Sequence, residues 1–170
     1  KASSSKKESD TTNGYSTAAP AAAAAPAAAA ATTSTGTLGN ITGDFGKALE
    51  IIWELEGGNT KDGGYVVDTG GPTRYGITQD NARIHTGYTG DMRQFPKELA
   101  VKTYKDYWTN YGLNDIKGFP LAVAMYNTVV NSGPARASKF VTRMLGLPES
   151  KAGKLKPDWV SALNAKPAGQ

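Results

Sequence analysis

The sequence predicts a mainly α-helical, α+β domain with one small β-hairpin immediately after its first helix. Three observations support this fold class. An apolar stretch with helical spacing runs from Phe45 to Leu55. Two short β-prone runs, residues 65–68 and 73–77, flank a Gly-Gly-Pro turn. Further apolar stretches with helical spacing follow residue 96, so helices are expected to supply most of the core.

Residues 1–40 differ in composition from the rest and are expected to form a disordered or extended tether. They are small and polar at both ends, with an alanine run interrupted by Pro20 and Pro26 between them. Such a segment lacks the apolar side chains needed for a core, and proline interrupts the helix that alanine favours. The composition is typical of a spacer, with a merely disordered tail as the alternative.

The remaining residues, 41–170, suit one compact domain. The chain opens on Lys-Ala-Ser-Ser-Ser, without methionine or a hydrophobic signal core. We therefore expect it to be a piece of a longer protein. No apolar run reaches the length that spans a membrane, so no membrane insertion is expected.

The charge and the rare residue types limit the chemistry. The formal net charge is +4, and residues 1–40 hold three lysines against Glu8 and Asp10, which leaves +3 on the domain. This mild excess suits an anionic polymer, either a bacterial cell wall or nucleic acid. The chain has no cysteine and a single histidine, His85, which we place on a helix surface. No metal site and no cofactor are expected from that inventory.

The helices can be placed from caps, stripes and breakers. Thr42 or Asp44 can cap the first helix, which is expected to run to about Glu56. A stripe that includes Tyr107, Trp108 and Tyr111 is predicted to pack in the core. Later helices are expected over residues 79–86 after a Thr78 cap, from Pro96 to Tyr111, over Leu121–Val130 as the buried central helix, over Ala137–Leu145 before Gly146, and from Pro157 to Leu163.

Glu56 is the strongest candidate for a catalytic residue. On a wheel of about 100° per residue it falls within about 40° of three apolar residues: Phe45, Leu49 and Ile52. The helix's other charged residues, Lys47, Glu50 and Glu54, point the opposite way. A carboxyl against hydrophobic neighbours keeps its proton to higher pH, which a general acid needs. A solvated helix-end carboxylate or a structural ion pair is the alternative.

The hairpin after Glu56 carries groups that glycosidic cleavage uses. Such cleavage needs a protonated carboxyl beside the scissile oxygen and a second group on the opposite face of the sugar. Asp68 could be that second group, and Thr73 could hold a water. Tyr65 and Tyr75 could line a cleft, and we place Arg74 with them as substrate-binding residues. The alternatives are that Asp68 caps the turn and that Thr73 is an ordinary strand residue.

These residues together resemble glycoside hydrolase family 108, the lysozyme-like N-acetylmuramidases. The resemblance rests on residues 56–58 (Glu-Gly-Gly), 65–68 (Tyr-Val-Val-Asp), 70–73 (Gly-Gly-Pro-Thr) and 75–78 (Tyr-Gly-Ile-Thr). In the family the glutamate, two glycines and tyrosine often stand nearly adjacent, whereas here residues 59–64 intervene. A second alignment takes Gly63-Gly64-Tyr65 as the matching block with Asp62 as the acid, but Asp62 follows no apolar helix.

The resemblance extends downstream and implies three segments within the domain. Residues 104–108, 125–127, 130–133 and 144–146 look like the peptidoglycan-binding region that commonly follows the catalytic segment. The family usually has an aspartate where Asn127 stands. We therefore expect a catalytic segment over 41–95, a helical peptidoglycan-binding-like segment over 96–147, and a C-terminal tail or short helix over 148–170.

The resemblance implies a lysozyme-like fold and hydrolysis of the β-1,4 bond between N-acetylmuramic acid and N-acetylglucosamine. Glu56 would be the general acid, Asp68 and Thr73 supporting groups, and Asn131 either a cleft residue or a helix-end cap. Peptidoglycan is then the expected partner. The alternatives are a lytic transglycosylase, a chitosanase, or a non-catalytic peptidoglycan-binding module.

The tether suggests delivery by a larger assembly, either a phage tail or a secretion machine. We expect a virion-associated or secreted protein that acts in the bacterial periplasm or cell wall, with a free endolysin as a further alternative. Nucleic acid is not an expected partner, because the basic residues are scattered and no phosphate-binding loop follows the glycine pairs.

Overall fold

The computed structural model describes residues 43–56, 60 and 63–166, and of Asp68 it describes the backbone alone. The expected tether, the Thr42 cap and Asp62 lie outside these residues. The helices are α1 (Gly43–Leu55), α2 (Gln79–Thr86), α3 (Lys97–Tyr111), α4 (Phe119–Ser132), α5 (Pro134–Met144) and α6 (Pro157–Ala165). Two short 3₁₀ turns, η1 (Met92–Gln94) and η2 (Leu113–Asp115), and three strands, β1 (Val66–Asp68), β2 (Gly71–Arg74) and β3 (Ile77–Thr78), complete the fold.

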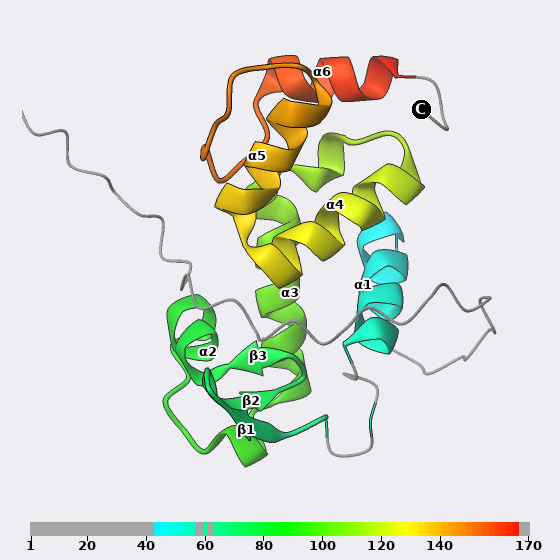
Figure 1. Cartoon of the computed structure of the whole chain (residues 1–170). Helices are drawn as coiled ribbons and strands as arrows, with labels where there is room; N and C mark the ends of the chain where they lie inside the picture. Colours follow the sequence, from blue (N-terminus) through cyan, green and yellow to red (C-terminus); the bar gives the residue numbers. More distant parts are fainter. Residues whose placement is uncertain (1–42, 57–59, 61–62, 167–170) are drawn as a thin grey trace, which may run out of the picture.

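The elements form two ends joined by α3 (Figure 1). The small sheet and α2 lie at one end, and α4, α5 and α6 lie at the other. Helix α3 extends from the sheet end into the helical end, and α1 packs against both α3 and α4. The expected mainly α, α+β lysozyme-like fold is confirmed.

The wheel pattern of the first helix holds in three dimensions. Leu49 and Ile52 are fully buried, whereas Glu50 and Glu54 are exposed. Burying each of these two aliphatic side chains contributes about 1.5–3 kcal/mol. Asp44 lies in the first turn of α1 and is not its cap. The apolar face of α1 is therefore what orients the end of the helix, where Glu56 follows.

An aromatic cluster fills the centre of the molecule. As predicted, Tyr107, Trp108 and Tyr111 are buried on α3. Tyr104 and Tyr126 are fully buried beside them, and Trp108 meets Tyr126 edge to face with ring centroids 5.2 Å apart. This edge-to-face geometry is favoured by the ring quadrupoles.

The prediction of a single hairpin is incomplete, because the sheet has three antiparallel strands in the order β1-β2-β3. The second pairing, Arg74 with Ile77, is closed by a two-residue turn at residues 75 and 76. Pro72 fits in β2 because it pairs with Val67 of β1, while pairing with β3 begins only at Thr73. The middle strand thus avoids the hydrogen bond that proline cannot donate.

The second turn holds a backbone conformation that tyrosine rarely adopts. Tyr75 has φ 53° and Gly76 has φ 72°. Positive φ at both central residues is the conformation that type I′ hairpin turns require. A side chain at positive φ is strained, so neighbouring contacts must compensate for Tyr75.

Two helices are less buried than their sequences predict. Helix α4 was expected to be buried nearly all round, but its fully buried residues lie on one side: Ala122, Met125, Tyr126 and Val129. On α5, Phe140 and Met144 are 48% and 42% exposed. The α5 residues packed inward are small or polar, including Ala137, Ser138 and Thr142. Close approach of α5 to the core therefore depends on those small side chains.

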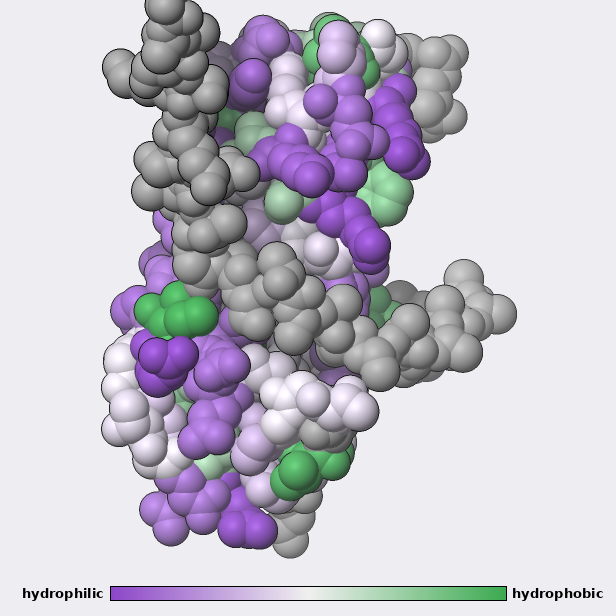
Figure 2. Space-filling view, turned by 60° about the vertical axis from the view of Figure 1, so that its left-hand side comes forward, coloured by the Kyte–Doolittle hydropathy of each residue, from purple (hydrophilic) through white to green (hydrophobic). Residues whose placement is uncertain are grey.

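The face shown in Figure 2 is mostly hydrophilic, and its apolar residues appear in separate small areas. Within the described part of the chain, no helix combines the length and apolar character needed to cross a bilayer.

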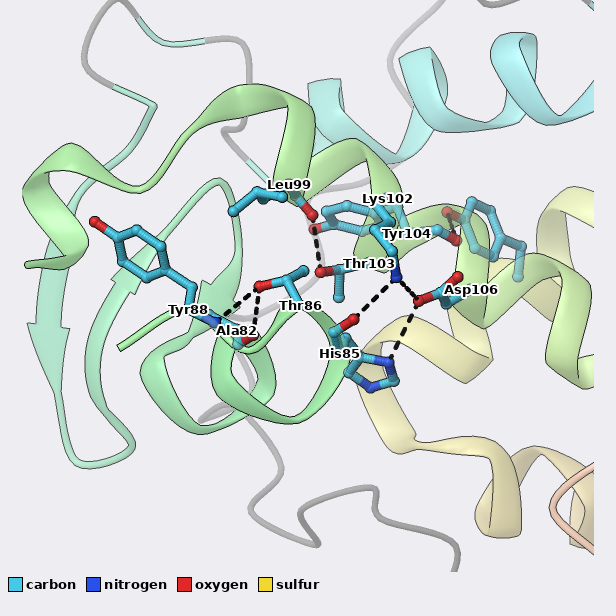
Figure 3. Close-up of polar contacts among 10 residues, drawn as sticks. Ala82, His85, Thr86, Tyr88, Leu99, Lys102, Thr103, Tyr104 and Asp106 are labelled. Atoms are coloured by element: carbon cyan, nitrogen blue, oxygen red, sulfur yellow. Dashed lines mark hydrogen bonds and ion pairs between the residues drawn. The ribbon is translucent and has the colours of Figure 1, made fainter. Parts of the chain in front are cut away.

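His85 is not the surface residue that the sequence predicts. Its side chain is only 9% exposed, and Nδ1 lies 3.9 Å from Oδ2 of Asp106 on α3. The ring meets Tyr107 edge to face at 4.9 Å. Lys102 Nζ donates to the His85 carbonyl oxygen at 3.0 Å and to Asp106 at 2.9 Å (Figure 3). This cluster joins α2 to α3.

Substituting Gly76 tests the packing of the strained turn. A Cβ at this position would lie 2.6 Å from the Tyr104 hydroxyl oxygen. Gly87 is the matched control, because it has nearly the same φ, 73°, with nothing near its Cβ position. Gly87→Ala should lower the free energy of unfolding by about 1–2 kcal/mol. Gly76→Ala should cost at least about 1 kcal/mol more, because a buried hydroxyl is displaced. Chemical denaturation checks this, and equal losses would contradict it.

The environment of His85 predicts a stability loss in mild acid. Burial lowers the pKa of His85, Asp106 opposes this, and Lys102 adds to it. Since the pKa is lower in the folded than in the unfolded chain, the unfolded chain binds more protons, and the free energy of unfolding falls as pH drops below about 6.5. His85→Gln should lose less stability than the wild type between pH 7.5 and 5.5 in thermal melts. Parallel losses would show that other groups cause the pH dependence.

Candidate active site

Glu56 lies where the first helix ends and three parts of the chain meet. Its N–H donates to the carbonyl of Ile52 at 2.9 Å, so the residue continues the helical backbone by one position. Its side chain is half-buried. Asn131 on α4 donates from Nδ2 to Oε1 of Glu56 at 2.9 Å. A Cβ on Gly76 would come within 3.8 Å of the Glu56 Cβ, so the strained turn also lies against this residue.

A buried tryptophan one turn before Glu56 supports the turn. Trp53 is fully buried, and its ring stacks on Tyr75 with centroids 5.7 Å apart and an interplanar angle of 20°. Tyr104 meets Trp53 edge to face at 5.9 Å. Stacking on Trp53 holds the Tyr75 ring, and with it the strained turn, against the last part of α1.

Tyr104 connects the turn to the helical core. Its hydroxyl donates to the carbonyl of Tyr75 at 3.0 Å, and the Tyr126 hydroxyl donates to the Tyr104 carbonyl at 2.9 Å. Burial raises the pKa of Tyr104 far above its ordinary value, and the nearby Glu56 raises it further. Tyr104 is therefore a neutral hydroxyl donor at any pH at which the protein would work.

The two proposed supporting groups lie on neighbouring strands. Asp68 ends β1, with its backbone paired to Gly71. Thr73 is buried in β2, where its hydroxyl donates to the Gly71 carbonyl at 3.3 Å. The hydroxyl thus has a partner within its own strand, and the roles of both residues in catalysis stay predictions.

The predicted substrate-binding residues of the sheet lie among cations. The Arg74 guanidinium lies 5.1 Å from the Tyr75 ring centroid, and that of Arg93 lies 5.2 Å from the ring centroid of Tyr65. Arg74 Nη1 also donates to the Arg93 carbonyl. Lys97 adds a third cation, 5.2 Å from the ring of Trp53. We call Arg74, Arg93 and Lys97 the basic edge.

The sequence analysis missed several residues that form this site. Trp53 and Tyr104 were assigned only to helical stripes, and no pattern distinguishes an aromatic residue that supports a turn from one that fills a core. Asn127 was noted only for its departure from the family. Its spacing of four from Asn131 places both on one helix face, and this signal could have been used.

Among residues 43–56, 60 and 63–166, no cluster of three or more histidine, aspartate or glutamate side chains could hold a metal ion.

Comparison with known proteins places this arrangement in a family. A family model described as Glycosyl hydrolase 108 matches residues 49–133, which include Glu56, the sheet and Asn131. The solved structure of SagA from Brucella abortus is similar, with a TM-score of 0.60 and 25% sequence identity over 73% of this chain and 70% of that one. No curated protein matches the chain. The match spans half of the sequence and all of the site described above, so the chain belongs to glycosyl hydrolase family 108 and is by family a glycoside hydrolase.

Proposed function

We propose that the protein hydrolyses the β-1,4 bond between N-acetylmuramic acid and N-acetylglucosamine in bacterial peptidoglycan, with Glu56 as the general acid. The observation that carries the proposal is the position of Glu56. It is half-buried at the end of α1, with Asn131 on one carboxyl oxygen and the Tyr75–Gly76 turn alongside. Membership of glycosyl hydrolase family 108 supports the same role.

The chemistry follows from what glycoside cleavage requires. Glu56 protonates the oxygen of the leaving sugar as the bond to C1 breaks, and positive charge develops on the other sugar ring. In the proposal, Asp68 stabilises that charge or activates water from the opposite face, and Thr73 positions the water. Tyr65, Tyr75 and Arg74 bind the saccharide from the sheet side.

The basic edge supports an anionic polymer as the substrate. Arg93 is exposed, and Arg74 and Lys97 are half-buried. All three lie on or near the aromatic residues that lead to Glu56. Cations in this position favour peptidoglycan, whose lactyl and peptide groups carry carboxylates, over the uncharged or cationic polymers that a chitosanase would take.

We further propose that a larger assembly, a phage tail or a secretion machine, delivers the domain to the cell wall. The alanine, proline, serine and threonine composition of residues 1–40 supports this, because it suits a spacer between a domain and a larger body. Sedimentation of the full chain with isolated tail particles tests the proposal.

Glu56→Gln tests the acid role with little change in shape. Glutamine keeps an oxygen that can accept from Asn131 but has no proton to donate. Clearing of purified sacculi should slow by about 10²–10⁴-fold. Glu54→Gln is the matched control, because Glu54 is exposed on the same helix, and its activity should stay within about twofold. Equal clearing by wild type and Glu56→Gln would exclude the acid role.

Mass spectrometry of the released fragments defines the reaction. A reducing N-acetylmuramic acid end is expected. A 1,6-anhydro end would identify a lytic transglycosylase instead. Binding to sacculi without release of fragments by the wild type would identify a binding module.

Arg74→Gln tests the basic edge. Loss of one contact to an anionic group should raise KM for sacculi about tenfold, equivalent to about 1.4 kcal/mol, with kcat within about twofold. Arg83→Gln is the control, because Arg83 is exposed on α2 and pairs only locally, with Asp80 at 3.6 Å. Thermal melts accompany both. A fall in kcat together with a lower Tm would mean that Arg74 supports the sheet and does not bind substrate.

A further inference from the structure

Helix α4 directs two asparagines, one helical turn apart, towards the proposed acid. Asn131 Nδ2 lies 2.9 Å from Oε1 of Glu56, 2.9 Å from Oδ1 of Asn127 and 3.1 Å from the backbone carbonyl oxygen of Asn127. One amide nitrogen therefore faces three oxygens, contributed by α4 and by the end of α1. All three groups are half-buried, where such contacts are stronger than in water.

The backbone decides which way the Asn131 amide points. Turning the amide over would place its oxygen beside the Asn127 carbonyl oxygen, and two acceptors repel each other. The Asn127 side chain could also turn over and donate instead, but its backbone carbonyl is part of the helix and cannot. Nitrogen therefore stays directed at Glu56 whether or not that carboxyl carries a proton.

We infer that Asn131, oriented by Asn127, is a positioning residue that keeps a permanent hydrogen-bond donor on Oε1 of Glu56, so that the catalytic proton resides on Oε2. This inference rests on the proposed function, in which Glu56 is the general acid. An oxygen that already accepts an N–H is the poorer site for a proton, which leaves Oε2 to carry it.

The assignment defines the proton-transfer step. The Oε2–H bond breaks while an O–H bond forms on the leaving sugar and the bond from that oxygen to C1 breaks. The negative charge left on Glu56 is stabilised by the N–H of Asn131 at Oε1, since a donor favours the charged form of a carboxyl. Water then adds to C1, and the proton that this water releases restores the carboxyl.

The other groups that face Glu56 do not supply this effect. The turn contributes the backbone of Gly76. From α3 comes the Tyr104 hydroxyl, which burial keeps neutral and which donates to the Tyr75 carbonyl. On α1 itself the preceding acid, Glu54, is exposed. Asn131 is thus the side chain with a donor on the carboxyl within the described part of the chain.

The test measures the titration of Glu56 directly, by NMR of its side-chain carboxyl carbon, with Glu56→Gln used to assign the signal. Asn131→Ala removes the donor, and Asn131→Asp replaces it with an acidic side chain. The midpoint should move upward by about one pH unit in Asn131→Asp and by a smaller amount in Asn131→Ala. Asn110→Asp, which adds the same charge at an exposed position on α3, should leave it unchanged.

Activity provides the second readout. The alkaline limb of kcat/KM on sacculi should move in the same direction in both Asn131 variants, with a lower plateau. Unmoved titration and an unmoved limb in both variants would overturn the inference, including where Tm falls, since that result means a structural role alone. Failure of the wild type to release fragments would instead overturn the proposed function, and the NMR titration would still decide the role of Asn131.

Discussion

The hydrogen bond from the Tyr104 hydroxyl to the Tyr75 carbonyl is the constraint on which the site geometry depends. Tyr75 has a positive φ that its side chain disfavours, and this bond is one of the contacts that hold it there. A second is the 2.6 Å bond from its own N–H to the Gly63 carbonyl, and a third is the stack on Trp53. Together they hold the sheet's second turn against the end of α1.

The same packing brings together chain segments that are far apart in sequence. Glu56 and Asn131 are separated by 75 positions, yet their side chains are in hydrogen-bond contact. Closing so long a segment has an entropic cost that the contact itself does not offset. The buried aromatic residues of α3 and α4 offset it, because Tyr104 and Tyr126 fix the two helices to each other. The polar contact at the site is therefore a result of the core packing.

Patterns local in sequence predicted much of the fold. The helical face of Leu49 and Ile52, the Thr78 cap and the breaker at Gly146 each depend on neighbours a few residues away, and local rules describe these well. The prediction was wrong at His85 because its burial depends on Tyr107 and Asp106 of a different helix. No spacing rule reports such a contact.

The candidate site divides in the same way. Glu56 could be predicted because its own helix aims it at an apolar face. The partner on its carboxyl could not, because α4 approaches only after the core has formed. The third strand was missed because Tyr75 does not look like a turn residue. A tyrosine at positive φ is stabilised by tertiary contacts alone, and sequence propensity describes the isolated backbone.

The strain at Tyr75 also bears on how such a protein can be engineered. Heat-tolerant variants are commonly obtained by replacing a residue held at positive φ with glycine or asparagine, which relieves the backbone. Here that exchange would remove the ring that packs on Trp53 and receives Arg74. Gains in thermal tolerance at this position would therefore come at the expense of the rigidity that aligns the acid with its saccharide. Stabilising changes are better directed to exposed helix positions at the far end of the molecule.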